Sequence, residues 1–436
     1  MMKDHSKTLR VSRREVLRGL AALAGSVVLP EGLAIPAAAW KLYGGDEQFL
    51  DELVRQGCLF FWEQGSPRTG QILDRARNDL SGGRDPRRMA SIASTGFGLT
   101  ALCIADQHGY LPHAQVVERV RTTLHWHLHQ MPEVHGFFYH FTDIETGRRW
   151  TRSELSSIDT AILLCGVLTA RAWFQDGQIK ALAQQIYERV DWPWMLNGGP
   201  AFSMGWRPVR GFLKARWSHY CELMMLYLLA IGSPTRPVPP ETWNHFTRPV
   251  IHYKGFEYIS GAAPLFTHQY SQAWYDFRNR RDAYANYFEN SVIATRAHKA
   301  FCLSYPRWFN EDYWGVSASD SARGYTAWGG PPPTGPLDGT VVPCATAGSL
   351  AFLPVDCLAV LRAMRMKWGK RAWGRYGFAD AFHPAANWYD PDVIGIDQGI
   401  SVLMAENLRS GMVWRTFMCN PESERAMRLA GFKAES

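Results

Sequence analysis

The sequence predicts an all-α protein, an α/α toroid with short β-hairpins and with long loops that form a cleft at one end. About ten to twelve helical segments follow one another in the 436 − 39 = 397 residues after an N-terminal leader, and this spacing matches ordinary helix and connection lengths. Long stretches rich in glycine, proline and aromatic residues separate these segments. No runs of β-branched residues alternate with the helices, which argues against a parallel α/β fold.

Residues 1–39 are predicted to be a twin-arginine signal peptide. Ser12–Arg18 has the sequence SRREVLR, Gly19–Leu29 is an apolar run too short to anchor the chain in a bilayer, and a cleavage site is expected near Ala39. Such a leader directs a folded bacterial protein to the twin-arginine export machinery. We therefore expect a periplasmic or secreted protein without a stable membrane anchor, with residues 40–436 as a single catalytic domain.

The composition excludes some classes of partner. A balance of 46% apolar and 20% charged residues is typical of a globular protein. The formal net charge is +7, but the leader holds six Lys/Arg and three acids, so 7 − 3 = +4 remains for the rest. Without a dense basic run, nucleic acid is not an expected partner. Because a buried indole N–H needs a partner, we expect several of the 18 tryptophans to line a groove.

The cysteines and histidines do not predict a metal site, and no cofactor is expected. The eight cysteines form no C-x-x-C pair and lie mostly in apolar segments, so buried free thiols are the favoured interpretation, although an exported protein can also form disulfides. His125, His127 and His129 alternate, but the surrounding pattern is helical, so only the first and third share a face. No nucleotide-binding glycine loop or G-x-S-x-G motif occurs.

The elements follow in order from the mature N-terminus. Helices are expected from Asp46 to Trp62, from Ala90 to His108, which Gly109 ends, and from Pro112 to about Gln130. Later elements are recognised by the same signals: a helix from Asp176 to about Trp192, a hairpin within Ala201–Trp217, a helix from Ser218 to Ile231, a helix from Arg281 to Leu303, a loop at 314–339, a helix within Thr346–Lys367 interrupted at Pro354, a helix from Ile400 to Gly411 and a last helix from Asn420.

The stretch from His135 to Phe174 is the centre of the prediction. Aromatic residues lead into a turn marked by Asp143 and Gly147, which indicates a short hairpin. Glu154 follows, and then an apolar helix from Thr160 to Phe174, with Ser156 or Ser157 as its N-cap and Asp159 in its first turn. Capping and the helix dipole explain Asp159. They do not explain Glu154, which is either a solvated loop acid or part of a site.

Glu222 is the second acid of interest. It lies among Cys221, Leu223 and Met225 at the start of an apolar segment, and the loss of hydration there should raise its pKa. Glu154 has Arg152 and several hydroxyl groups nearby, which favour its ionised form. A protonated acid together with an ionised one is what cleavage of a glycosidic bond requires. The alternative for Glu222 is an acid that only stabilises a helix N-terminus.

Aromatic rings and acids in the predicted loops are candidates for sugar binding. Flat rings can stack on sugar faces, but they can equally pack in the core. Loop acids can bind hydroxyl groups, but they more often cap helices. The candidates of this kind are Trp274, Trp314, Tyr325, Trp328, Asp320 and Asp397.

Together these segments resemble the glucoamylase-like domain family that includes bacterial endo-β-1,2-glucanases (glycoside hydrolase family 144 and relatives). The resemblance runs in order along nearly the whole mature chain, through SIASTGFGLTAL at 91–102, HGFFYHFTDIETGRRW and SELSSIDTAILLCGVL within 135–168, WSHYCELMMLYLLAIGSPT at 217–235, LFTHQYSQAWYDFR at 265–278, YFENSVIATRAH at 287–298, WGVSASDSARGYTAWG at 314–329 and IGIDQGISVLMAENLRSGMVW at 394–414.

The resemblance implies an (α/α)6 toroid that hydrolyses β-1,2-linked glucan, most simply with inversion. Glu154 and Glu222 match acids of the family, and Asp159 matches an acid that supports its site. Substrate contacts are expected from Tyr139, Trp217, Tyr220, Gln272, Trp274, Trp314, Asp320, Tyr325, Trp328 and Asp397. Two positions depart from the pattern, since Gln272 replaces a common His and Val355 a common Glu, and these put the preferred linkage or chain length in doubt.

The resemblance does not say which glutamate is the acid. From their surroundings we expect Glu222 to be the general acid and Glu154 to be the base that acts through water. The alternatives are a transglycosylase or a hydrolase of another β-glucan on the same scaffold, and, more remotely, a non-catalytic glycan-binding protein or a polysaccharide lyase. A lyase would use basic residues such as Arg207, Arg210 and Arg216 against uronate carboxylates.

Overall fold

Besides the short, fully buried α9 (Tyr270–Trp274) and α11 (Pro343–Ala347), four longer helices in the described part of the chain are buried along nearly their whole length and form the inner part of the fold. They are α3 (Ile92–Gln107), α5 (Ser157–Trp173), α8 (Met224–Ile231) and α13 (Gly395–Arg409). Residues on all sides of these helices are apolar or small, so each helix can be surrounded by others. The computed structural model describes residues 42, 44–331 and 335–435; the predicted leader at 1–39 lies outside them.

A second set of helices is buried on one face only. It comprises α2 (Gly44–Glu63), α4 (His113–His129), α6 (Gly177–Glu188), α10 (Tyr287–Leu303) and α12 (Pro354–Trp368). Their apolar residues recur with helical spacing and pack on the inner set, whereas their other faces meet solvent. The remaining helices are short: α7 (Trp192–Leu196), α9 (Tyr270–Trp274), α11 (Pro343–Ala347), α14 (Met412–Met418), α15 (Pro421–Leu429), and the 3₁₀ turns η2 (Pro240–Asn244), η3 (Leu265–His268), η4 (Gly369–Arg371) and η5 (Pro384–Ala386).

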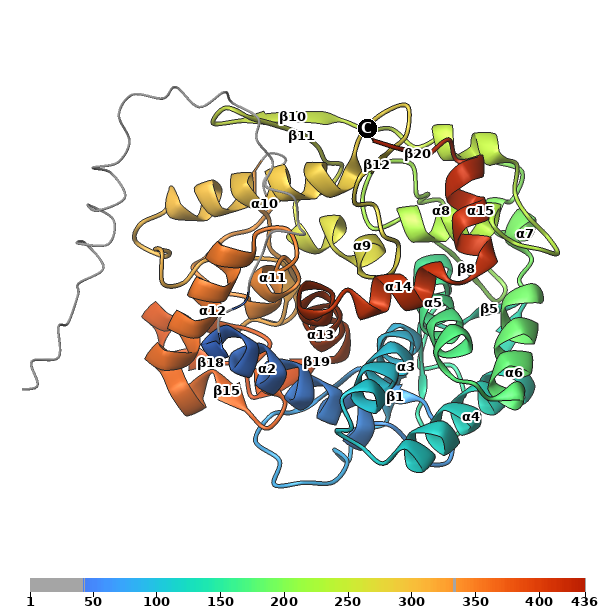
Figure 1. Ribbon diagram of the computed structural model, residues 1–436, viewed down its shortest axis with the longest axis horizontal. Helices are drawn as coiled ribbons and strands as arrows, with labels where there is room; N and C mark the ends of the chain where they lie inside the picture. The colour runs from blue at the N-terminus through green and yellow to red at the C-terminus, as the bar shows by residue number, and fades with distance from the viewer. Residues whose placement is uncertain (1–41, 43, 332–334, 436) are drawn as a thin grey trace, which may run out of the picture. The chain divides into compact units, whose positions relative to one another are not determined.

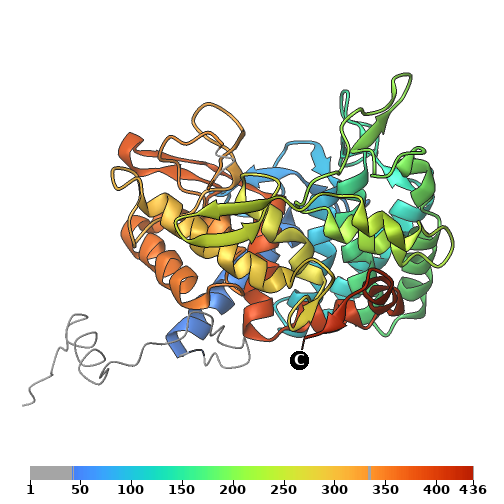
Figure 2. The same ribbon diagram turned by 90° about the horizontal axis from the view of Figure 1, so that it is seen from above.

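The helices are arranged in a ring, as the sequence predicts (Figure 1). The chain passes around the ring from α2 to α12, and α13 then returns to pack against α2 and α3, which closes the circle. Loops and hairpins gather along one side of the helices, the upper edge of Figure 2. The all-α toroid prediction is confirmed. In the described part of the chain no helix is both long and apolar enough to cross a bilayer.

The approach of α3 to α5 depends on two glycines. A Cβ on Gly166 would lie 2.0 Å from the carbonyl oxygen of Gly96, and a Cβ on Gly96 would lie 2.4 Å from the carbonyl oxygen of Ile162. No side chain fits at such distances, so these residues allow the two helix backbones to touch. The contact matters for function because α5 begins next to Glu154.

Gly166→Ala is therefore expected to lower the free energy of unfolding by about 2–3 kcal/mol, because α3 and α5 must move apart. Urea denaturation followed by circular dichroism measures this change. Gly177→Ala is the matched control, since a Cβ there has no neighbour within 4 Å. Equal stability of the Gly166 variant and the wild type would contradict the close contact.

The strands are short and form small antiparallel sheets on the loops. Three of these sheets shape the site: β7–β8–β9, in which β8 pairs with both neighbours, β19–β2, and β13–β14. The strands are β1 (Ile72–Leu73), β2 (Arg75–Arg77), β3 (Met89–Ser91), β4 (Glu133–Val134), β5 (Phe137–Phe138), β6 (Phe141–Asp143), β7 (Leu155–Ser156), β8 (Gly205–Arg207), β9 (Gly211–Phe212), β10 (Val250–Tyr253), β11 (Phe256–Ile259), β12 (Arg280–Arg281), β13 (Ala318–Ser319), β14 (Thr326–Ala327), β15 (Trp373–Gly374), β16 (Gly377–Phe378), β17 (Phe382–His383), β18 (Trp388–Tyr389), β19 (Asp392–Ile394) and β20 (Lys433–Ala434).

Some predicted helix boundaries are wrong, and the reason is long-range pairing. The helix expected from Ser218 begins only at Met224. Residues 218–220 are extended instead, because the Thr247 N–H donates to the Ser218 carbonyl at 2.8 Å and the Tyr220 N–H donates to the Thr247 carbonyl at 2.8 Å. The helix expected from Arg281 likewise starts at Tyr287, where Asn286 caps it.

Candidate active site

The junction of β7 and α5 positions the first group of acids. Ser156 is the N-cap of α5, and its hydroxyl accepts a hydrogen bond from the Asp159 N–H at 3.2 Å. This confirms the predicted cap and fixes Asp159 in the first helical turn. Glu154 lies immediately before β7, whose Ser156 pairs with Gly205 of β8.

Gly205 lets β8 lie close to Glu154. A Cβ at this position would be 2.3 Å from the Leu155 carbonyl oxygen and 3.1 Å from Cγ of Glu154. Any larger residue would push the two strands apart. The side chain of Glu154 thus lies against β8 and reaches Arg207, which is on the same strand.

Glu154 is held in its ionised form. His140 Nδ1 lies 3.5 Å from its Oε1, and Arg207 Nη2 donates to its Oε2 at 3.2 Å. The hydrogen bond from His140, with that of Arg207 and the charge on the imidazole, lowers the pKa of Glu154 to about 2 against the opposing effect of burial. Glu154 favours its ionised form, as predicted, but its partners are His140 and Arg207. The expected partner Arg152 is exposed to solvent.

His140 joins two of the acids, and the sequence argument did not single it out. Its Nδ1 faces Glu154, and its Nε2 lies 3.5 Å from Oδ1 of Asp159. Burial alone would lower the pKa of His140, but the neighbouring charges of Asp159 and Glu154 outweigh it and raise the pKa. The only sequence signal was a histidine within a run of aromatic residues, and its ring does stack on Phe141.

Glu222 has the opposite environment. It lies two residues before α8 and is partly buried among apolar residues. Burial raises its pKa to about 7, and the charge of Asp159 acts in the same direction. The Ser271 hydroxyl donates to the Glu222 carbonyl at 2.6 Å and so fixes the backbone there. The influence of Asp159 on Glu222 brings all three predicted acids into one site.

Two predicted substrate-binding rings flank this site. Trp217 donates from Nε1 to the Ser157 hydroxyl at 2.8 Å, and Arg149 lies over the ring of Tyr139 at 5.3 Å from its centre. Both rings are mostly buried, with 9% of their surface exposed. Each can therefore offer an edge to a ligand, but not a full face.

Four other predicted contact residues are buried in the core. Trp274 donates from Nε1 to Thr100 Oγ1 at 3.0 Å and lies in α9 rather than in a loop, and Trp314 and Tyr220 have no exposed surface either. The expectation that these rings stack on sugars is wrong for this structure, because neighbouring core residues cover the faces of the rings. The Gln272 amide also points inward and donates to the Tyr287 carbonyl at 2.6 Å and the Ser291 hydroxyl at 2.7 Å. The second family departure, Val355, is exposed in the first turn of α12.

A second group of predicted residues lies on β13, β14 and the start of α13. Tyr325 is 54% exposed, whereas Trp328 is buried and donates from Nε1 to the Ser319 hydroxyl at 3.0 Å. Asp397 is buried, and burial raises its pKa to about 6. Burial raises the pKa of Tyr270 too, and the charges of Asp397 and Glu222 both add to this. The charges of both groups of acids thus act on Tyr270.

Other motifs have structural roles. His125 and His129 share a face of α4 with their rings 4.6 Å apart, while His127 is buried and donates from Nδ1 to the Thr123 carbonyl at 2.7 Å. All eight cysteines are free thiols in the structure, and seven of them are buried. A cavity of about 1100 Å³ lies between α2 and residues 365–391, away from Glu154 and Glu222.

Comparison with known proteins supports this fold. The Glycoamylase family model, which describes a glucoamylase, matches residues 214–421. The chain is 26% identical over 427 residues to an exo β-1,2-glucooligosaccharide sophorohydrolase (non-reducing end) of Parabacteroides distasonis; the match covers 88% of this chain and 58% of that protein. This chain therefore spans little more than half the length of that relative.

Solved structures agree. An endo-β-1,2-glucanase from Chitinophaga pinensis, in complex with sophorotriose and glucose, superposes with a TM-score of 0.81 at 26% identity, covering 90% of this chain and 99% of that one. A β-1,2-glucanase from Parabacteroides distasonis superposes with a TM-score of 0.81 at 25% identity, and the match covers 90% of this chain and 60% of that one. An endo-β-1,2-glucanase from Talaromyces funiculosus shares the fold alone. It superposes with a TM-score of 0.66 at 12% identity, and the match covers 90% of this chain and 92% of that one.

The helix ring and these matches show an α/α toroid, part of which, residues 214–421, matches a glucoamylase family model. Within that class, the resemblance to the bacterial endo-β-1,2-glucanases and their relatives that the sequence indicated is confirmed.

Proposed function

We propose that this protein is a glycoside hydrolase that cleaves β-1,2-linked glucan by general acid–base catalysis. The observation that carries the proposal is the opposite displacement of two glutamate pKa values at one site, to about 7 for Glu222 and to about 2 for Glu154. The relatives that act on β-1,2-glucans supply the class of substrate.

The proposed reaction uses each acid in its favoured form. Glu222, protonated near neutral pH, donates its proton to the glycosidic oxygen as the bond to the anomeric carbon breaks. Glu154 accepts a proton from a water molecule, whose oxygen attacks the opposite face of the sugar. His140 positions Glu154 and Asp159 relative to each other through its two ring nitrogens. The product then has the inverted anomeric configuration.

The lyase alternative is weakened by the arginines on which it depended. Arg207 is already paired with Glu154, and Arg216 donates to the Leu196 and Ala201 carbonyls at 2.9 and 2.6 Å. Both side chains are therefore already engaged, whereas Arg210 is exposed and forms no ion pair in the described part of the chain. A transglycosylase, or a hydrolase of another β-glucan on the same scaffold, remains the second proposal.

The proposed setting is the periplasm or the exterior, reached through the twin-arginine machinery. The support is the SRREVLR core and the apolar run after it. A fusion of residues 1–39 to a folded reporter should be exported, and Arg13→Lys with Arg14→Lys should retain it in the cytoplasm.

The function is tested by incubating the mature protein with linear β-1,2-glucan. We expect short β-1,2-linked oligosaccharides whose new reducing ends first appear as the α-anomer in proton NMR. β-Anomeric products would overturn the inverting mechanism. No cleavage of this glucan, together with cleavage of or transfer to another β-glucan, would favour the second proposal.

A further inference from the structure

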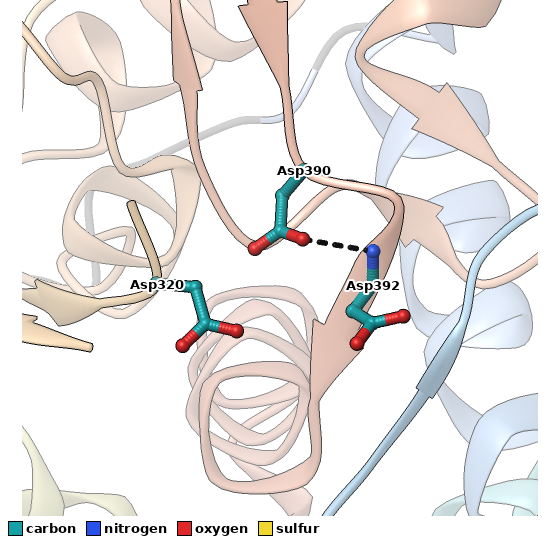
Figure 3. Close-up of side chains that lie close together, drawn as sticks. All are labelled: Asp320, Asp390 and Asp392. Atoms are coloured by element: carbon teal, nitrogen blue, oxygen red, sulfur yellow. Dashed lines mark hydrogen bonds between the residues drawn. The ribbon is translucent and has the colours of Figure 1, made fainter. Parts of the chain in front are cut away.

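Three aspartates converge beside the second group of residues. Asp320 follows β13, and Asp390 and Asp392 lie at the start of β19. One carboxylate oxygen from each lies within 4.8 Å of those of the other two. Figure 3 shows the three carboxyl groups directed toward a common space.

Asp390 has a buried oxygen without a partner. Its side chain accepts a hydrogen bond from the Asp392 N–H at 3.0 Å through Oδ1, whereas Oδ2 has no hydrogen-bond donor among the described residues. The residue is only 7% exposed, so solvent water has little access to this oxygen. Figure 3 shows this second oxygen on the side of Asp320. Buried carboxylate oxygens are ordinarily satisfied, which indicates that a further group belongs here.

The charges around the cluster do not balance. Two arginines reach it, but each is shared with a further aspartate: Arg75 contacts Asp74 and Asp320, and Arg87 contacts Asp85 and Asp392. Five carboxyl groups therefore face two guanidinium groups, and carboxyl groups outnumber these cations by 5 − 2 = 3. Asp390 has no cationic partner among the described residues.

We propose that Asp320, Asp390 and Asp392 bind one divalent cation, with Ca²⁺ as the ion that fits. Carboxylate oxygens are the donors that hard cations prefer. Ca²⁺ accepts oxygen ligands at about 2.3–2.6 Å in flexible geometry, whereas Mg²⁺ requires a near-ideal octahedron at about 2.0–2.1 Å, so Ca²⁺ suits three carboxylate oxygens that lie within 4.8 Å of one another. Asp390 also lines the cavity of about 1100 Å³, which gives an ion a path from solvent.

The ion joins segments that are distant in sequence. β13 and β14 carry the loop with Tyr325, β19 leads into α13 with Asp397, and β19 pairs with β2. A cation between β13 and β19 fixes this loop relative to α13 without touching the reacting atoms. The proposed role of the ion is thus structural, and Asp320, one of the expected substrate contacts, binds the ion instead.

The test is calorimetric titration of chelator-treated, dialysed full-chain protein with Ca²⁺. We expect one site in the wild type, weaker binding of Mg²⁺, and at least about tenfold weaker Ca²⁺ binding in Asp390→Asn, which loses a charged ligand. Asp79→Asn is the matched control, because Asp79 is exposed and pairs with Arg77 outside the cluster; it should bind Ca²⁺ like the wild type. Ca²⁺ should raise the melting temperature of the wild type and the control, but not of Asp390→Asn.

Two results would overturn the site. One is a wild type that takes up no Ca²⁺, and the other is an Asp390→Asn protein that binds it as tightly as the wild type does. Circular dichroism shows whether Asp390→Asn is folded. If Asp390→Asn is not folded, Asp320→Asn replaces it in the titration, because Asp320 is closer to solvent and its substitution disturbs the core less. Unchanged Ca²⁺ affinity in Asp320→Asn would equally contradict the proposal.

Discussion

Glu222→Gln is expected to lower kcat/KM on β-1,2-glucan by about 10²–10⁴-fold, since the amide has no proton to give to the leaving oxygen. The substitution keeps the size and shape of the side chain, so the loss should come from chemistry and not from packing. Initial rates of release of reducing ends measure it. Substrates with a good leaving group, such as an aryl glycoside, should lose less, because they depend less on the acid.

The wild type should show a matching pH dependence. Glu222 must hold its proton to act, so kcat/KM should fall as the pH rises through about 7. Glu154 stays ionised until the pH approaches about 2, so it does not limit activity under mildly acidic conditions. A profile without a basic limb near neutrality would contradict the assignment of Glu222.

The pH dependence of stability distinguishes the loss of the proton donor in Glu222→Gln from a loss of folding. The pKa of Glu222 is higher in the folded state than its ordinary value of 4.5. Between these pH values the folded state binds more protons than the unfolded state, so the wild type loses stability as the pH rises. Glu222→Gln lacks this loss and should melt no lower than the wild type at pH 8. Glu289→Gln, which replaces another partly buried glutamate in α10, should keep activity within about twofold of the wild type.

Local sequence signals predicted several helix starts well. Pro112, Asp176 and Asn420 each precede the helix that they were expected to begin, and Pro354, which was expected to interrupt a helix, is the first residue of α12. The failures have a different cause. Residues 218–220 have the apolar context of a helix, but their backbone pairs with Thr247, and nothing within a few residues of Ser218 reveals that partner.

The acids of the site were predictable, but their partners were not. Glu154, Asp159 and Glu222 have unusual local settings in the sequence. His140 and Arg207 reach Glu154 only because the loop before β6 and the strand β8 both fold against β7. The same limit applies to Trp274 and Trp314: the sequence shows flat rings between polar and glycine-rich segments, whereas their burial is decided by helices elsewhere in the ring.

Glu154→Gln is expected to reduce kcat/KM by about 10²–10⁴-fold as well, because the attacking water loses its base. It should also lower the pKa of His140, which depends on the charges of Asp159 and Glu154. NMR titration of the His140 ring therefore reports on the contact independently of turnover. Glu145→Gln is the matched control. Glu145 lies just after β6, near His140 in sequence, and pairs with Arg68 and Arg84. Its substitution should leave kcat/KM and the pKa of His140 nearly unchanged.

Azide tests on which face of the sugar Glu154 acts in the Glu154→Gln protein. Azide needs no base, so it can attack the anomeric carbon directly while Glu222 protonates the departing oxygen. It should restore turnover and give the α-glycosyl azide, because it enters from the face opposite the leaving group. A β-glycosyl azide would place Glu154 on the leaving-group side and contradict the assignment. The anomer that the wild type first releases then distinguishes a base from a nucleophile: the α-anomer requires a single displacement by water, and the β-anomer requires a covalent intermediate on Glu154.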